Sequence, residues 1–253
     1  MDVAQLEIRG LTVEFDGFRA IDGLDLTVVP GELRFLIGPN GAGKTTVLDV
    51  VTGLTAPSAG SVLFGGTDLL GLQPHVIVRL GVGRTFQTSA VFDELSVVDN
   101  VDLAASFRTR LPSLLRRRRG VAEAVAEALD SVGLAHLARA PASSLSHGQR
   151  QWLEIAMLLV QQPRLLLLDE PVAGMTAAER ERTGVLLARI SRSRTVVVVE
   201  HDMGFVRRFA RRVTVLHEGR TLCDGTIAQV QADPRVQEVY LGRGHNELRQ
   251  QVR

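Results

Sequence analysis

The chain has 253 residues, a length that accommodates one large α/β unit with a smaller domain attached. Hydrophobic residues make up 45% of it and charged residues 23%, a composition that excludes an intrinsically disordered protein. The formal net charge of +1 predicts no general attraction to nucleic acid, and the single cysteine, Cys223, excludes an intrachain disulfide.

The first part of the chain predicts short strands that lead into a glycine-rich loop. Apolar runs separated by turns indicate strands at residues 6–8, 11–15, 24–28 and 33–37, the last of them buried. Helical spacing starts near residue 43 and ends near residue 53, and residues 61–64 return to a strand pattern. The order strand, glycine-rich loop, helix is therefore expected around residues 33–53.

The middle and the end of the chain differ in their periodicity. Residues 97–107, 121–132 and 149–160 have the spacing of amphipathic helices, which predicts a separate helical lobe. After residue 163, strand-like segments at 165–168, 195–199 and 213–217 alternate with helix-like segments at 177–191 and 203–210. This alternation predicts a parallel sheet covered by helices on both faces.

Features of membrane-spanning and secreted chains are not expected here. The apolar stretches end in charged residues far short of the ~18 residues that a spanning helix needs. The start MDVAQLEIRG carries Asp2 and Glu7 where a secretory leader has a basic region followed by a long apolar block. We therefore expect a cytoplasmic protein.

The stretch GPNGAGKT, residues 38–45, fits the phosphate-loop pattern G-x-x-x-x-G-K-[ST] at every required position. Its glycines allow backbone N–H groups to turn around phosphate oxygens, and the start of the helix adds partial positive charge. Lys44 is expected to reach the outer phosphates and the Thr45 hydroxyl to bind Mg²⁺. The strand before the loop and the helix after it disfavour a turn that only joins two elements.

Three further stretches carry candidate catalytic groups. LLLLDEP predicts a buried strand with Asp169 placed for a magnesium shell and Glu170, on the opposite side of the strand, placed to orient or deprotonate water. VVVVEHD ends with His201, a candidate contact for the γ-phosphate, although a lone histidine at a strand end is more often structural. Gln87, after the strand-like residues 82–85, can touch both metal and water.

The turn LSHGQ, residues 145–149, lies at the start of a helix. A capped helix start explains Ser146 and Gly148 but leaves Gln149 without a role. The small residues would allow a phosphate to approach the start of the helix closely.

Taken in order, GPNGAGKT, RTFQ, LSHGQ, LLLLDEP and EHD resemble the ATP-binding subunit of ABC transporters over about residues 6–242. The resemblance implies an α/β P-loop NTPase fold with a RecA-like parallel sheet core and an antiparallel β subdomain in residues 1–87 and 161–242. It further implies a small α-helical subdomain in residues 88–160 and a polar tail in residues 243–253. The expected activity is hydrolysis of ATP with Mg²⁺.

The resemblance also implies roles for individual residues. Catalytic roles would belong to Glu170, His201, Lys44 and Gln87, and metal binding to Thr45, Gln87 and Asp169. The nucleotide would contact Phe15, Gly38, Pro39, Asn40, Gly41, Ala42, Gly43, Lys44, Thr45, Thr46, Ser146, Gly148 and Gln149.

Two qualifications accompany these roles. Ser146, Gly148 and Gln149 would act on the ATP held by a second subunit, and Phe18 is the alternative to Phe15 for stacking adenine. His147 and the stretch VAGMT, residues 172–176, depart from the commonest family pattern, which has Gly and Ser-Ala-Leu-Asp there.

The implied partners are a second ATP-binding subunit, identical or different, and two transmembrane permease subunits on the inner face of the cell membrane. An extracytoplasmic substrate-binding protein would act indirectly, and no nucleic acid partner is expected. The stretches EPVAGMT, LSHGQRQWLEIAMLL, EHDMGFVR and DPRVQEVYLG resemble importers for branched-chain amino acids, amides and urea. VAGMT combined with SHGQ-x-QWLEI is most similar to the urea-type subunit.

The expected function is therefore ATP hydrolysis that energises import of urea. An importer of branched-chain amino acids or amides is the alternative. A soluble ABC ATPase of translation or DNA repair is a second alternative, although such relatives carry two fused ATP domains or a long coiled coil. A P-loop kinase would fit the phosphate loop and Asp169 but leave LSHGQ and His201 without a purpose.

Overall fold

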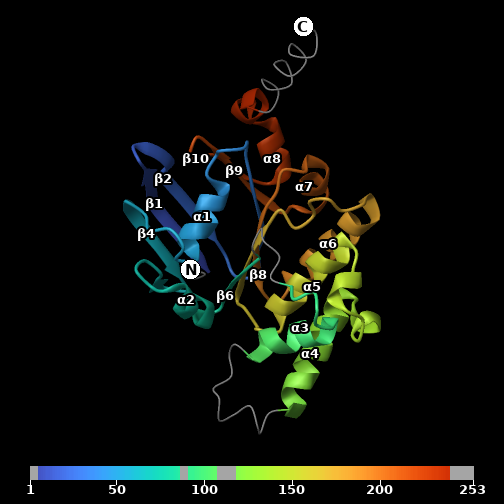
Figure 1. Cartoon of the computed structure of the whole chain (residues 1–253). Helices are drawn as coiled ribbons and strands as arrows, with labels where there is room; N and C mark the ends of the chain where they lie inside the picture. The colour runs from blue at the N-terminus through green and yellow to red at the C-terminus, as the bar shows by residue number, and fades with distance from the viewer. Residues whose placement is uncertain (1–4, 86–90, 107–117, 240–253) are drawn as a thin grey trace.

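A computed structural model describes residues 5–85, 91–106 and 118–239 of the chain. Two sheets lie side by side, with helices around the larger of them (Figure 1). The smaller sheet has the strand order β2-β1-β4-β5, and all its neighbouring strands are antiparallel. Its strands are β1 (Leu6–Phe15), β2 (Phe18–Val28), β4 (Ala59–Phe64) and β5 (Thr67–Asp68).

The larger sheet has the strand order β10-β9-β3-β8-β7-β6. Its strands are β3 (Leu33–Ile37), β6 (Val82–Arg84), β7 (Leu165–Asp169), β8 (Thr195–Val199), β9 (Arg212–His217) and β10 (Arg220–Gly225). All neighbouring pairs are parallel except β10 with β9. Since parallel strands end at the same edge, the segments that follow β3, β7 and β8 meet there.

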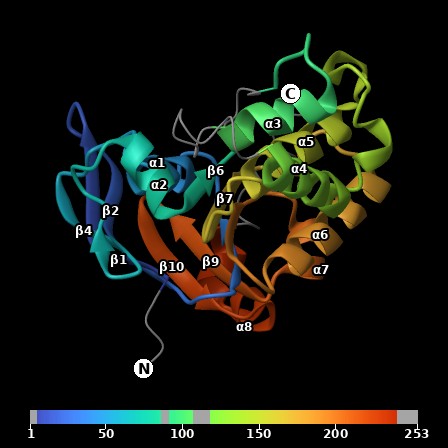
Figure 2. The ribbon, with the colours of Figure 1, turned by 90° about the horizontal axis from the view of Figure 1, so that it is seen from below.

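The helices divide between the two faces of the larger sheet and a separate layer. They are α1 (Lys44–Val51), α2 (Pro74–Leu80), α3 (Val97–Ser106), α4 (Arg118–Val132), α5 (His147–Leu159), α6 (Ala177–Ile190), α7 (Met203–Phe209) and α8 (Ile227–Ala232). Helices α3, α4 and α5 contact one another and lie away from the antiparallel sheet (Figure 2).

Alternate side chains of the buried strands build two hydrophobic cores. On β7, Leu165 and Leu167 join the core that α1 and the antiparallel sheet form with one face of the larger sheet. Leu166 and Leu168 join the core on the other face, which contains residues of α3 to α8. A strand covered on both faces must be apolar at every position, which explains the uninterrupted run of leucines.

The architecture is that of a P-loop NTPase, as expected from the sequence. Some local predictions were wrong. The two strands expected at residues 6–8 and 11–15 form the single strand β1, with a register shift that includes Gly10 at a φ of 54°. Helix α2 was missed, because it has only seven residues and buries only Ile77. Within the described residues, no helix is long and apolar enough to cross a membrane.

Candidate nucleotide site

The phosphate loop connects β3 to α1, and two of its glycines are required by close contacts. A Cβ atom at Gly38 would lie 2.2 Å from the carbonyl oxygen of Leu216. At Gly43, which has a φ of 97°, a Cβ atom would lie 2.5 Å from Ile21 Cδ1 and 2.6 Å from Ala20 O. No other residue therefore fits these two positions without moving the neighbouring backbone.

Lys44 holds the loop in a closed curve. Its Nζ donates hydrogen bonds to Gly38 O at 2.8 Å and Pro39 O at 3.0 Å, and the residue is 8% exposed. The loop itself leaves Asn40 and Gly41 exposed and Ala42 buried, while Thr45 and Thr46 are half-buried in the first turn of α1. A positive charge inside a curve of backbone is the arrangement that binds a polyphosphate.

Asp169, the last residue of β7, has the properties of a metal ligand. Its side chain is 1% exposed, and neither carboxylate oxygen has a hydrogen-bond partner among the described residues. Burial raises the pKa of Asp169, whereas the Arg84 guanidinium and the nearby Thr45 hydroxyl lower it and Glu170 raises it. A buried carboxylate beside a threonine hydroxyl suits Mg²⁺, so these residues fit the metal that the sequence implied.

Further ligands for that metal would come from outside the protein or from Gln87. The described part of the chain contains no group of three or more His, Cys, Asp or Glu side chains able to hold a metal. Proteins commonly bind Mg²⁺ through one or two of their own oxygens, with phosphates and water completing the shell. Gln87 lies outside the described residues.

Arg84, on β6, was not assigned a role from the sequence although it stands in the quoted stretch RTFQ. Its guanidinium lies 2.5 Å from Asp49 Oδ1 on α1 and 3.6 Å from Asp169 Oδ2. Next to it, the Thr85 hydroxyl accepts a hydrogen bond from the Asp169 backbone N–H at 3.2 Å. The edge strand β6 is therefore bonded directly to the residue that would hold the metal.

Glu170 and His201 face each other across the carboxyl ends of β7 and β8. His201 Nδ1 lies 3.3 Å from Glu170 Oε1, and both side chains reach solvent. The strand ends at Asp169, and Glu170 has a φ of 49°, so the expected alternation of sides along one strand does not place Glu170. Its position comes from a strained turn, stabilised by its N–H bond to Val199 O at 2.9 Å.

The turn LSHGQ begins α5 and has local structural reasons for all three of its candidate residues. Ser146 is the N-cap and forms a capping box with Gln149, whose Oε1 accepts the Ser146 backbone N–H at 2.9 Å. The interpretation that a capped start leaves Gln149 unexplained was wrong, because the capping box requires Glu or Gln at this position. Gly148 also has a local reason, since a Cβ atom there would lie 2.6 Å from Glu179 Oε1 and the Glu179 side chain would have to shift.

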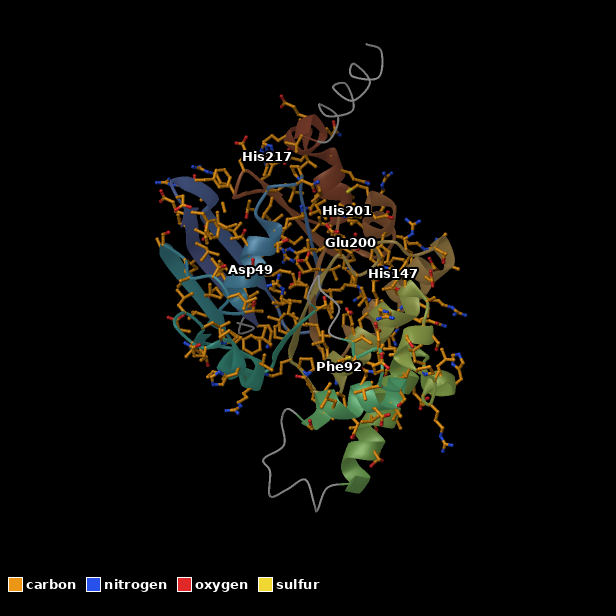
Figure 3. All side chains as sticks on the ribbon, in the orientation of Figure 1. Asp49, Phe92, His147, Glu200, His201 and His217 are labelled. Atoms are coloured by element: carbon orange, nitrogen blue, oxygen red, sulfur yellow. The ribbon has the colours of Figure 1, made fainter. Side chains whose placement is uncertain are left out.

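The two departures from the family pattern contact each other. His147 donates a hydrogen bond from Nε2 to Ala173 O at 3.0 Å, and its ring packs against Gly174. Ser146 Oγ also donates to Glu179 Oε1, at 3.3 Å, in the first turn of α6. The start of α5, where His147 lies (Figure 3), is thus bonded to the segment that follows Glu170.

The two candidate adenine-stacking residues lie opposite each other at the end of the β1–β2 hairpin. Phe15 is 48% exposed and Phe18 is 65% exposed, so neither ring is buried in a hydrophobic core. A planar base can stack on an aromatic face that is free on one side. Exposure alone does not separate the two residues, and Phe15 stays the prediction.

A phosphate loop, a strand-end carboxylate pair and a facing histidine define a P-loop ATPase site. Residues 21–173 match the family model for the ABC transporter, and residues 220–246 match that for the branched-chain amino acid ATP-binding cassette transporter. The chain belongs to the ABC transporter family as one of its ATP-binding subunits, and it is an ATPase.

Two named transport proteins are similar to this chain over nearly its full length. The high-affinity branched-chain amino acid transport ATP-binding protein BraF of Pseudomonas aeruginosa is 38% identical, with 94% of this chain and 97% of that protein covered. LivG of Escherichia coli K12, with the same description, is 36% identical with the same coverage.

Solved structures agree with this family. The ADP conformation of MJ1267, an ATP-binding cassette of an ABC transporter, superposes with a TM-score of 0.84 at 28% identity, covering 94% of this chain and 99% of that chain. A dimeric post-hydrolysis state of the cassette MJ0796, bound to ADP and Pi, has a TM-score of 0.74 at 25% identity, covering 88% and 98%.

These relatives do not support the expectation of urea. The two described above are named for branched-chain amino acids, which was the alternative.

Proposed function

We propose that this chain is the ATPase subunit of an ABC importer for branched-chain amino acids. The similarity to BraF and LivG along nearly the whole chain carries the proposal. The match of residues 220–246 to the branched-chain amino acid cassette model supports it independently, because that segment lies outside the ATP-binding motifs.

In the proposed cycle, the phosphate loop binds the triphosphate of ATP. Lys44 would exchange its bonds to Gly38 O and Pro39 O for phosphate oxygens. Thr45 and Asp169 would hold Mg²⁺, with Gln87, and the bound ion would neutralise charge on the β- and γ-phosphates. Phe15 would stack on adenine.

Glu170 would orient and deprotonate the attacking water. His201, 3.3 Å from the Glu170 carboxylate, would keep that carboxylate in place and contact the γ-phosphate. Both groups lie partly exposed at the edge of the sheet where the phosphate loop also starts, so water and nucleotide can reach them.

The site would be completed by a second subunit, identical or different. Ser146 is exposed at the N-cap of α5 and Gly148 is buried in its first turn, and the N-terminal partial charge of this helix favours an anion. The dimeric structure of MJ0796 bound to ADP and Pi is a relative in which two cassettes associate. ATP-driven closure of two subunits and reopening after phosphate loss would then move the attached permeases at the membrane.

An apolar groove offers a docking place for a permease. It has a volume of about 630 Å³ and is lined on one side by α2, β6 and the residues that follow α1, and on the other side by residues of α3 and α5. Leu54, Val78, Phe92 and Leu103 in this groove are between 39% and 54% exposed. A cytoplasmic helix of a permease would bury these side chains. Because the helix would contact both sides of the groove, it would move when the α3–α5 layer moves relative to α2 and β6.

Replacing Leu103 with Asp is expected to reduce transport at least tenfold while changing the ATPase rate of the isolated subunit less than about twofold. Burying a charged side chain against the permease is costly. Leu103 is exposed in the free chain, so the same charge should hardly affect the folding or the ATPase activity of the isolated subunit. Val185→Asp, at another exposed aliphatic residue, on α6, is the control and should transport normally. Equal transport by both variants would reject the groove as the docking place.

Uptake assays test the substrate. The chain, its permeases and its binding protein should be expressed together in a host lacking its own branched-chain importers and urea transporters. We expect ATP-dependent uptake of labelled leucine, isoleucine and valine, abolished by Glu170→Gln. Uptake of urea alone would replace the proposed substrate with urea, and copurification with ribosomes or DNA instead of permeases would favour a soluble ATPase.

A further inference from the structure

Glu200 carries a buried carboxylate that none of the proposed steps uses. It follows β8 directly and is 1% exposed, whereas its neighbour His201 is exposed. Burial raises the pKa of Glu200, although backbone hydrogen bonds from its surroundings lower it. Placing a carboxylate where water is excluded is costly unless donors surround it, so its donors indicate what it does.

Three backbone N–H groups donate to this one carboxylate. Oε1 accepts from Val172 at 3.2 Å, and Oε2 accepts from His201 at 3.0 Å and from Asp202 at 3.3 Å. Val172 belongs to the segment after β7 and the other two donors to the segment after β8. The carboxylate therefore joins two segments that are about thirty residues apart in the chain.

Both joined segments carry a proposed catalytic group. Val172 lies two residues after Glu170, and the His201 N–H bond fixes the main chain from which the imidazole extends. Asp202 is held further by capping α7 and by an ion pair with Arg180. Glu200 and His201 lie close together (Figure 3), and the hydrogen bonds of Glu200 thus support the 3.3 Å approach of His201 to Glu170.

The charge pattern requires a carboxylate at this position. Two oxygens accept three N–H donors, and a glutamine has only one acceptor oxygen, so its NH₂ group would face a donor. Glu200→Gln therefore keeps the volume of the side chain but leaves at least one buried N–H unsatisfied and repelled.

We propose that Glu200 is a positioning residue for ATP hydrolysis, which fixes the main chain of His201 relative to the loop that carries Glu170. The inference rests on the proposed roles of Glu170 and His201. It goes beyond them because Glu200 would act through the backbone of two loops rather than on the nucleotide or the metal.

The test compares Glu200→Gln with Val213→Ala in the complete chain. Val213 is equally buried, on β9, so its truncation reports the effect of lost stability alone. We expect Glu200→Gln to lower kcat about 30-fold and to change the KM for ATP less than about threefold, because misplacement acts on the chemical step. Val213→Ala should lower the melting temperature with kcat within about twofold of wild type.

A spectroscopic measurement separates positioning from stability. The six histidines can be labelled with ¹³C, and the His201 ring signal assigned with His201→Gln. That signal should move in Glu200→Gln and stay in place in Val213→Ala. Glu200→Asp, which keeps the charge on a shorter side chain, should give an intermediate kcat and serves if Glu200→Gln does not fold.

Two results would overturn the inference. One is a kcat for Glu200→Gln no lower than for Val213→Ala, and the other is an unmoved His201 signal. If His201→Gln itself hydrolyses ATP at the wild-type rate, the proposed role of His201 fails instead, while the ring signal still reports whether Glu200 holds that segment.

Discussion

Replacing Glu170 with Gln is expected to lower ATP hydrolysis about a thousandfold and to leave ATP binding intact. The amide has nearly the same shape as the carboxylate but cannot accept a proton from water. The phosphate loop and Asp169 are unchanged in this variant, so the nucleotide still has its charged partners. Phosphate release measures the first effect, and titration with a fluorescent ATP analogue measures the second.

Glu181→Gln is the matched control for this variant. Glu181 is an exposed carboxylate on α6, paired with Arg208 on the protein surface, and takes no part in the proposed site. Its neutralisation should leave kcat within about twofold of wild type, since exposed ion pairs contribute little to stability. Normal turnover by Glu170→Gln would remove Glu170 as the catalytic base.

Gly148→Asp is expected to abolish hydrolysis, through the partner's site rather than through its own. The new side chain would displace the Glu179 side chain and place a second negative charge at the start of α5. In the proposed dimer this charge faces the γ-phosphate held by the other subunit. ATP binding to the monomeric variant should therefore be normal, while the rate of hydrolysis falls to background.

Mixing two inactive variants distinguishes action in trans from action in cis. In a dimer of Glu170→Gln with Gly148→Asp, one site combines an intact Glu170 with an intact partner turn. With equal amounts of the two variants, random pairing makes about half of the dimers mixed. Each mixed dimer has one active site of its two, so about one quarter of the wild-type rate should return. A mixture as inactive as its parents, with dimers demonstrated by crosslinking, would argue against a site shared between two copies of this chain.

Motifs with fixed local geometry were readable from the sequence. The roles of Gly38, Gly43 and Lys44 can be predicted from the loop alone, because its backbone conformation and the residue spacing determine which atoms turn inward. The uninterrupted leucines of residues 165–168 likewise identify a strand buried on both faces, whatever else surrounds it. The phosphate loop and the order of the core elements therefore follow from short-range rules.

Gln149 shows where a local rule was available and missed. The spacing of Ser146 and Gln149 is that of a capping box, a pattern that needs no tertiary information. Its presence means that Ser, Gly and Gln in this turn have structural reasons within the chain. The proposed role toward the partner's ATP consequently rests on the family resemblance, and the mixing experiment tests it.

The sequence by itself determined the phosphate loop, the acidic pair of Asp169 and Glu170 and the class of ATPase to which the chain belongs. Tertiary structure alone decided that Arg84 lies beside Asp169, that His201 faces Glu170 and that the Glu200 carboxylate joins two loops. Those contacts connect residues that are distant in the chain. They depend on the order in which strands join the sheet, which no short stretch of sequence encodes.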